Sequence, residues 1–195
     1  MVNRLTDEPY LTQEQMNIII NSQRLWLQLA FAIRSLLFSV LRDPDRTQAS
    51  ANQLFNIVAV RFYDYFRLYY GIEVAQTVVN LLSAFITNMW RLFTGISAND
   101  SEMVNSSTAE IYRIADETAS YLSSINLYWD ENQWKEFLYQ MIQTSIEQTL
   151  SLARQDFDRE YRLFSRITDL AALTGNYMAR GIIARSAVQT PLINM

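Results

Sequence analysis

Residues 25–41 read LWLQLAFAIRSLLFSVL, a run so apolar that it belongs either in the core of a helical protein or in a membrane. Arg34 lies in the middle of this run. An arginine at the centre of a bilayer costs about 2.5–3.5 kcal/mol, and lipid would not favour the narrow stripe of small or polar side chains that a helical projection gives the run. We therefore expect the most buried helix of a soluble bundle, with a membrane-associated helix as the alternative. The stripe consists of Gln28, Ala32, Ser35, Ser39 and Arg42.

The composition extends this expectation to the whole chain. Hydrophobic residues make up 50% of the 195 residues and charged residues 18%, which supplies a core and argues against disorder. Only 4 glycines and 3 prolines are present, and a β-rich fold would need more of them for its tight turns. We expect one all-α domain over residues 1–195, an antiparallel bundle of about six helices with an ordered core over about 12–185. The expected helices cover about 12–41, 47–70, 73–93, 101–124, 131–154 and 157–183, and the tail 189–195 is expected to be loose.

Several helix ends carry recognisable signals. Thr12 and Gln15 have the spacing of a capping box, and Pro44 disfavours helical backbone at Asp43. Gly71 is a good residue for a helix C-terminus, and a glycine near the end of the third helix is expected to stop it too. The connection between the last two helices is very short, so these helices should be antiparallel neighbours or nearly continuous.

A faint internal repeat relates two parts of the chain. Residues 54–71 and 81–86 share their apolar rhythm with residues 111–129 and 137–142, at an offset of roughly one helical hairpin. Two amphipathic hairpins can also resemble each other by chance, and that alternative stays open. The pattern predicts two related hairpins flanked by an N-terminal and a C-terminal helix.

Missing residue types exclude several kinds of chemistry. The chain has no Cys and no His, so disulfides, thiolate zinc sites, cysteine nucleophiles and imidazole bases or ligands are ruled out. Lys135 is the only lysine, and its surroundings, QWKEFL, are neither a glycine-rich loop nor an apolar pocket. The net charge of −4 and the lack of a basic cluster argue against nucleic acid. The N-terminus lacks the apolar run of a signal peptide, so we expect a cytoplasmic protein without a transmembrane segment.

Two pairs of adjacent acids are the only sequence candidates for acid–base work. Asp116 and Glu117 would point in different directions on a helix, and Asp130 and Glu131 lie at a helix start, where acids stabilise the dipole. The chain also has no nucleotide-binding or nucleophile-elbow motif. We therefore expect no catalytic residue, no metal and no cofactor, and a protein that is not an enzyme.

Arg34 is the residue that most needs a partner. It projects within the apolar arc of its helix, near Ala30 and Leu37, and a buried guanidinium needs a carboxylate, several carbonyls or an anionic ligand. Either Arg34 lies near the edge of the arc and reaches water or an acid, or it lines an internal polar pocket. No acid stands out as its partner, since most acids project to outer faces of their helices.

Three further polar residues were assigned to the interior from their positions. Asn88 and Gln148 intrude on apolar helix faces, and with Tyr161 they could form a small polar cluster in the core. Alternatively they are scattered interior groups, satisfied by helix carbonyls or waters. Together with Arg34, these residues are the candidate ligand-binding site, and its ligand would be an anionic small molecule.

The order of several short segments resembles a family of small all-helical bacterial proteins, common in spore-forming Firmicutes, whose members are uncharacterised or loosely labelled acetylglutamate kinase. The resemblance covers about residues 26–183 and implies a helical bundle. Nothing about a kinase follows from the label, because this chain has no phosphate-binding loop. The segments are LW with Arg34 eight residues after Trp26, YYG at 69–71 followed by LL at 81–82, LSSIN with Trp129, FLY at 137–139 and MARGII at 178–183.

The chain also departs from the pattern of that family. Members of the family tend to carry histidines on the bundle helices, and an imidazole-based site would be absent here because apolar residues replace them. The NP expected before the tryptophan is Asn126–Leu127. By rough alignment, the histidine positions hold Leu29, Phe85, Met141 and Leu170.

Three functions are compatible with these patterns. The first is a non-enzymatic bundle with a structural or protein-interaction role, possibly homo-oligomeric, which predicts a contiguous exposed apolar patch. The second is a bundle that binds an anionic small molecule at Arg34, in an internal pocket of roughly a few hundred Å³. The third is an enzyme or a membrane-associated protein, which would need inward-facing carboxylates or detergent.

Overall fold

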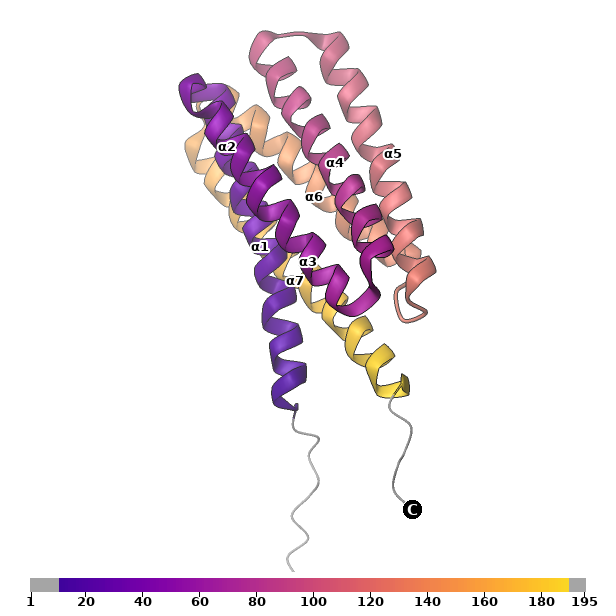
Figure 1. Ribbon diagram of the computed structural model, residues 1–195. Helices are drawn as coiled ribbons and strands as arrows, with labels where there is room; N and C mark the ends of the chain where they lie inside the picture. The colour runs from indigo at the N-terminus through magenta and orange to yellow at the C-terminus, as the bar shows by residue number, and fades with distance from the viewer. Residues whose placement is uncertain (1–10, 190–195) are drawn as a thin grey trace, which may run out of the picture.

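The computed structural model describes residues 11–189, except for the side chains of residues 188 and 189. Within this range every regular element is a helix, and Figure 1 shows the long helices running side by side. The expected all-α antiparallel bundle is confirmed. The elements are α1 (Gln13–Arg42), the 3-10 turn η1 (Pro44–Arg46), α2 (Thr47–Gln53), the π-helix η2 (Leu54–Val58), α3 (Ala59–Tyr70), α4 (Ile72–Ala98), α5 (Ser101–Ile125), α6 (Glu131–Ala153) and α7 (Phe157–Gln189).

Local capping groups set the ends of most helices. The Thr12 hydroxyl accepts a hydrogen bond from the Gln15 backbone N–H, and the Gln15 side chain accepts one from the Thr12 N–H, so the expected capping box is confirmed. Asp100 and Asp130 cap α5 and α6 in the same way. Gly71 has φ of +88°, which allows α3 to turn directly into α4. These short connections place consecutive helices antiparallel.

The long helices form a closed arrangement around one interior. α1 packs against α7 and α4, and the chain of neighbours continues from α7 through α6, α5 and α4 to α3. Two antiparallel hairpins, α3–α4 and α5–α6, are therefore flanked by α1 and α7 (Figure 1). The short connection between α6 and α7 joins antiparallel neighbours, as expected.

A π-helix interrupts the helix that was expected to run continuously over 47–70. A π turn contains one extra residue, so the face that points to the core rotates where η2 begins. Ala51 and Leu54 face the core before the rotation, and Phe62 and Phe66 face it afterwards. Phe55 was expected on the core face, but it is only partly buried, because the regular 100° projection does not hold across the π-helix.

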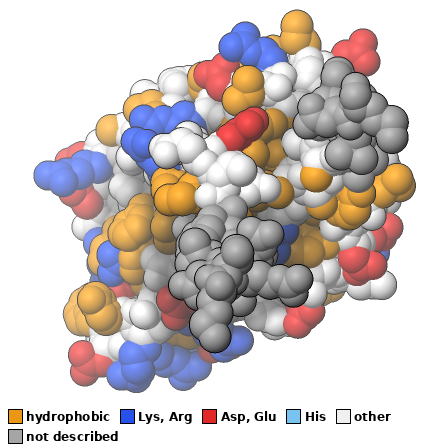
Figure 2. All heavy atoms as spheres, turned by 90° about the horizontal axis from the view of Figure 1, so that it is seen from below, with side chains coloured by type: hydrophobic (Ala, Val, Ile, Leu, Met, Phe, Trp, Pro, Cys, Tyr) orange, Lys and Arg blue, Asp and Glu red, His pale blue; other side chains and the backbone are white. Residues whose placement is uncertain are grey.

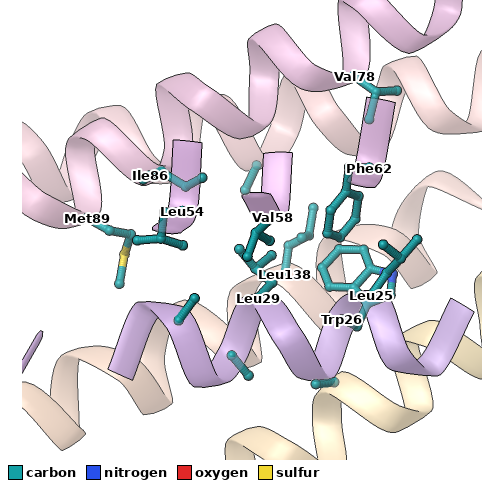
Figure 3. Close-up of a cluster of buried hydrophobic side chains, with 14 of the residues drawn as sticks. Leu25, Trp26, Leu29, Leu54, Val58, Phe62, Val78, Ile86, Met89 and Leu138 are labelled. Atoms are coloured by element: carbon teal, nitrogen blue, oxygen red, sulfur yellow. The ribbon is translucent and has the colours of Figure 1, made fainter. Parts of the chain in front are cut away.

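The core is built from large apolar side chains that converge from different helices. Figure 3 shows Trp26 and Leu29 of α1 meeting Phe62 of α3, Val78 of α4 and Leu138 of α6. All of them are buried. Burial of one such side chain stabilises the fold by about 1.5–3 kcal/mol, so this convergence is the main force that holds the helices together.

Helix α1 is not the most buried helix, and that expectation was wrong. Only 44% of its most apolar 18-residue window is buried inside the bundle. The stripe of small residues is where α2 packs: Ala32 is buried, and the Ser35 hydroxyl lies 3.3 Å from that of Ser50. Because the small stripe and the core face occupy two sides of α1, a third side, which includes Phe31, is left facing outward.

Helices α4 and α7 extend further than expected. The third helix was expected to stop near Gly95, but α4 continues to Ala98 and ends at Asn99, which has a left-handed φ of 55°. Gly95 serves packing instead, because a Cβ there would lie 3.1–3.2 Å from side-chain atoms of Val104 and Met103 on α5. α7 runs to Gln189 rather than stopping near residue 183, and residues 190–195 of the expected loose tail lie outside the described residues.

Candidate functional site

Arg34 has a carboxylate partner, Glu160, at the start of α7. Arg34 Nε donates to Glu160 Oε1 at 2.8 Å, and a terminal guanidinium nitrogen donates to Glu160 Oε2 at 2.9 Å. The Arg34 side chain is 28% exposed, whereas that of Glu160 is 3% exposed. The pair is therefore a bidentate ion pair with a buried acid and a partly exposed base. The statement that no acid partners Arg34 was wrong, since Glu160 does.

Two aromatic rings and an amide complete the surroundings of this pair. The Arg34 guanidinium carbon lies 4.7 Å from the ring centroid of Phe38 and 4.4 Å from that of Phe164. Gln148 of α6 donates from Nε2 to Glu160 Oε1 at 2.7 Å. Three helices, α1, α6 and α7, are thus joined by a network in which the positive charge already has its counter-ion. This pairing removes the reason for placing an anionic ligand at Arg34.

The sequence contains a signal for Glu160 that the projection did not use. Glu160 precedes Phe164, Ile167 and Ala171 at intervals of four, three and four residues, which is the spacing of one helix face. All of these residues are buried. An acid on an apolar face is the natural partner of an arginine on another apolar face.

The other two candidate ligand-binding residues do not join this network. Asn88 is buried, but its amide donates to the Ala84 carbonyl of its own helix and accepts from Arg91. Tyr161 is 70% exposed and lies on the outside of α7. Of the four candidates, only Arg34 and Gln148 are brought together, and both act through Glu160.

The acid pairs have structural partners. Asp116 accepts from the Tyr139 hydroxyl and lies 3.5 Å from Lys135 Nζ, and Glu117 pairs with Arg113. Tyr139's pKa is raised, chiefly by that hydrogen bond to Asp116. Over residues 11–189, no group of three or more acids is placed to hold a metal ion.

An interior cavity of about 80 Å³ lies among six of the helices. Its wall is largely apolar, and the polar residues on it are Thr118, Ser145 and Gln148. Gln148 therefore contacts the cavity and also the Glu160 carboxylate. The complete lining consists of Trp26, Leu29, Ala30, Ile33, Phe62, Phe66, Val78, Leu82, Phe85, Ala115, Thr118, Leu122, Leu138, Met141, Ser145, Gln148 and Ile167.

This cavity includes three of the positions at which the family resemblance would place histidines. Leu29, Phe85 and Met141 are on its wall, and Leu170 is buried elsewhere on α7. These side chains make the wall hydrophobic. The cavity is also smaller than the few hundred Å³ expected of a ligand pocket.

A second hollow is an open groove of about 370 Å³ between α1 and α3. It contains Arg24 of α1 and Arg61 of α3, together with Asp64. At its floor, the Tyr65 hydroxyl lies within hydrogen-bonding distance of Ser22 Oγ, and burial raises the pKa of Tyr65. The groove has the size and the cationic side chains that the Arg34 pocket was expected to have.

The outward side of α1 carries a stripe of apolar residues. Met16, Ile20 and Phe31 are 46%, 55% and 56% exposed, and Leu27 and Phe38 are partly exposed. We call these five residues the outer stripe. They follow one another at intervals of 4, 7, 4 and 7 residues, so they lie on one side of the helix. Among the described helices, α1 is also the one with the length and hydropathy of a membrane span.

Exposed hydrophobic residues elsewhere are more scattered. Figure 2 views the bundle from below and shows hydrophobic side chains interspersed with acidic and basic ones. Exposed residues near the connections at this end of the bundle include Ile72 and Leu127. Isolated apolar residues of this kind are normal on protein surfaces. The outer stripe differs because its members follow one helix without interruption by a charged residue on the same line.

Comparison with known proteins leaves the geometry as the only guide to function: no family model, no curated protein and no solved structure matches this chain.

Proposed function

We propose that this chain is a non-enzymatic interaction protein that associates with a second copy of itself through the outer stripe of α1. One observation carries the proposal: α1 is apolar on its outward side as well as on its core side. Met16, Ile20 and Phe31 are about half exposed along one line. A helix that is apolar on both sides is normally covered on both.

The outer stripe has a spacing that suits pairing with its own copy. Its residues span positions 16–38 and are centred on Leu27. Two copies crossing antiparallel at Leu27 bring Met16 of each copy to Phe38 of the other. Such an arrangement is closed by a two-fold axis, which is the commonest symmetry of soluble oligomers.

The size of the stripe predicts a weak dimer. Burying the exposed half of ten such side chains, five from each copy, contributes roughly 10 kcal/mol. Association costs about 4–15 kcal/mol in lost translational and rotational freedom and in side-chain ordering. The two amounts nearly cancel, so we expect a dimer that forms in the micromolar range or above and dissociates on dilution.

Sedimentation equilibrium over about 5–500 µM tests this proposal. The wild-type chain should move from monomer toward dimer over this range, whereas Phe31→Ser should stay monomeric. Leu173→Ser is the matched control, because Leu173 is 54% exposed on α7 and lies off the stripe. A wild-type chain that is monomeric at every concentration, or a control that dissociates as Phe31→Ser does, would contradict the proposal.

A second candidate function, binding of a small anion, is supported by the groove between α1 and α3. Arg24 and Arg61 come from different helices, and no carboxylate among residues 11–189 forms an ion pair with either. Inorganic phosphate titrated into the protein tests this function by calorimetry. Arg61→Gln should weaken any binding, and Arg162→Gln on the exposed face of α7 should not.

A further inference from the structure

The interior cavity has the makings of a ligand site, independent of the outer stripe. Helices α1, α3, α4, α5, α6 and α7 all contribute to its wall, so a bound molecule would contact most of the bundle. An apolar cavity of about 150 Å³ binds benzene, and this one has about 80 Å³. It is therefore matched to a molecule of up to about five heavy atoms.

Three deeply buried polar groups on the wall have atoms without a partner. Trp26 Nε1 is buried and makes no hydrogen bond within the described part of the chain. Ser145 Oγ and Gln148 Oε1 likewise have no hydrogen-bonding partner among residues 11–189, although both residues are at least nine-tenths buried. An unmet buried donor or acceptor costs about 1–3 kcal/mol. A ligand that met these atoms would recover that free energy.

The free atoms on the wall have a fixed orientation. A carboxylate only accepts hydrogen bonds, so Gln148 must turn its NH₂ group to Glu160 and its Oε1 the other way. Glu160 is in turn held by both nitrogens of Arg34. Ser145 precedes Gln148 by three residues on α6, which places the two side chains on the same side of the helix. The ion pair thus pre-orients one acceptor of the cavity.

We infer that the cavity binds a small, neutral, largely apolar molecule that carries one hydroxyl group. The hydroxyl oxygen accepts from Trp26 Nε1, and its hydrogen is donated to Gln148 Oε1 or Ser145 Oγ. The alkyl part contacts the hydrophobic wall. A charged molecule of the same size is excluded, because the one carboxylate nearby is already paired and a second charge would be desolvated without a counter-ion.

NMR of the four tryptophan indole N–H groups tests this inference with 1-butanol as the probe. Titration to about 50 mM should move the Trp26 resonance in a saturable way, because its N–H gains an acceptor. The assignment follows from the resonance that Trp26→Phe removes. Butyrate and butylammonium, which keep the alkyl chain but add a charge, should leave the Trp26 resonance in place. Absence of a saturable shift with 1-butanol, or an equal shift with the charged probes, would overturn the inference.

Cavity-filling variants show whether the shift comes from the interior. Ala115→Leu and Ala30→Leu fill the cavity from α5 and from α1, and either should abolish the shift. Ala153→Leu is the matched control at an exposed position of α6 and should bind as the wild type does. Ser145→Ala should weaken binding at least about threefold if the hydroxyl is engaged. Unchanged binding in a folded filled variant would place the butanol elsewhere and end the proposal; xenon binding without an indole shift would remove the hydroxyl requirement.

Discussion

Arg34 and Glu160 are 126 positions apart in the sequence, yet two N–H···O bonds of 2.8 and 2.9 Å hold their charged groups together. The contact joins the middle of α1 to the first turns of α7. The two partners differ in burial, with 28% of the arginine side chain exposed and 3% of the glutamate. The effect of removing one partner should therefore depend on which one is removed.

We expect Arg34→Met to lower the free energy of unfolding by about 3 kcal/mol, because it leaves the Glu160 charge buried with Gln148 as its remaining donor. Glu160→Gln should cost only about 1–2 kcal/mol, since the partly exposed guanidinium turns to water. Urea unfolding at pH 7 measures both values. The double variant Arg34→Met/Glu160→Met should lie within about 1 kcal/mol of the wild type. Equal losses in the two single variants would show that the asymmetry in burial has no energetic effect.

The contact between α1 and α7 also depends on Gly175. A Cβ at this position would lie 2.6 Å from Gln23 Cα and 2.8 Å from Gln23 N, and both atoms belong to the backbone of α1. Alanine is the better helix former by about 1 kcal/mol, so an unobstructed change would stabilise α7. We expect Gly175→Ala instead to destabilise the protein by about 2 kcal/mol, because the helices must separate.

Gly95→Ala is the control for that experiment. Its Cβ would meet flexible side-chain atoms of Met103 and Val104 at 3.1–3.2 Å, which can shift, so its effect should stay within about 0.5 kcal/mol. Chemical denaturation of both variants under the same conditions provides the comparison. A Gly175→Ala protein as stable as the wild type would mean that α1 and α7 pack less closely than described.

Buried tyrosines give the stability a dependence on alkaline pH. Burial raises the pKa of Tyr65 and of Tyr70, so the folded protein holds these protons more tightly than the unfolded chain does. Their contribution is complete below a pH of about 10 and is lost as the pH rises through their folded-state pKa values. The free energy of unfolding should therefore fall above pH 10 by up to about 1.4 kcal/mol per pH unit for each tyrosine.

Tyr65→Phe identifies the contribution of one of these groups. This variant loses the hydrogen bond to Ser22 and should be less stable at pH 7, but its stability should fall less steeply between pH 10 and pH 11.5. Tyr161→Phe, at an exposed position, should keep the wild-type slope. Equilibrium unfolding in urea at several pH values gives the slopes. Identical slopes for Tyr65→Phe and the wild type would show that Tyr65 does not titrate with unfolding.

The helices were predictable because their ends depend on nearby residues. The capping box at Thr12, the break at Pro44 and the turn at Gly71 each involve residues within a few positions of one another, and each was located correctly. The π-helix at 54–58 was missed, since an extra residue in one turn leaves no composition signal and shifts the apolar face only afterwards.

The arrangement of the site was harder to predict because it depends on the register between distant helices. Gln148 was placed correctly in the interior, but Tyr161 was assigned to the core although its neighbour Glu160 is the buried residue. One position corresponds to about 100° on a helix, so an error of one residue exchanges the core for the surface. Neither the cavity nor the outward stripe of α1 can be derived from a single helix, since both arise from how six helices share their faces.

Two non-glycine residues with a positive φ offer a last test of the helix ends. Asn99 (φ 55°) and Gln155 (φ 63°) end α4 and follow α6 in the left-handed region. The left-handed conformation costs an ordinary side chain about 1–2 kcal/mol, asparagine less and glycine none. After the greater flexibility of glycine in the unfolded chain is subtracted, Gln155→Gly should raise the free energy of unfolding by about 0.5–1 kcal/mol. Asn99→Gly should change it by no more than about 0.3 kcal/mol. Gln155→Ala keeps a Cβ and should give no gain, so a gain equal to that of Gln155→Gly would rule out relief of backbone strain as the cause.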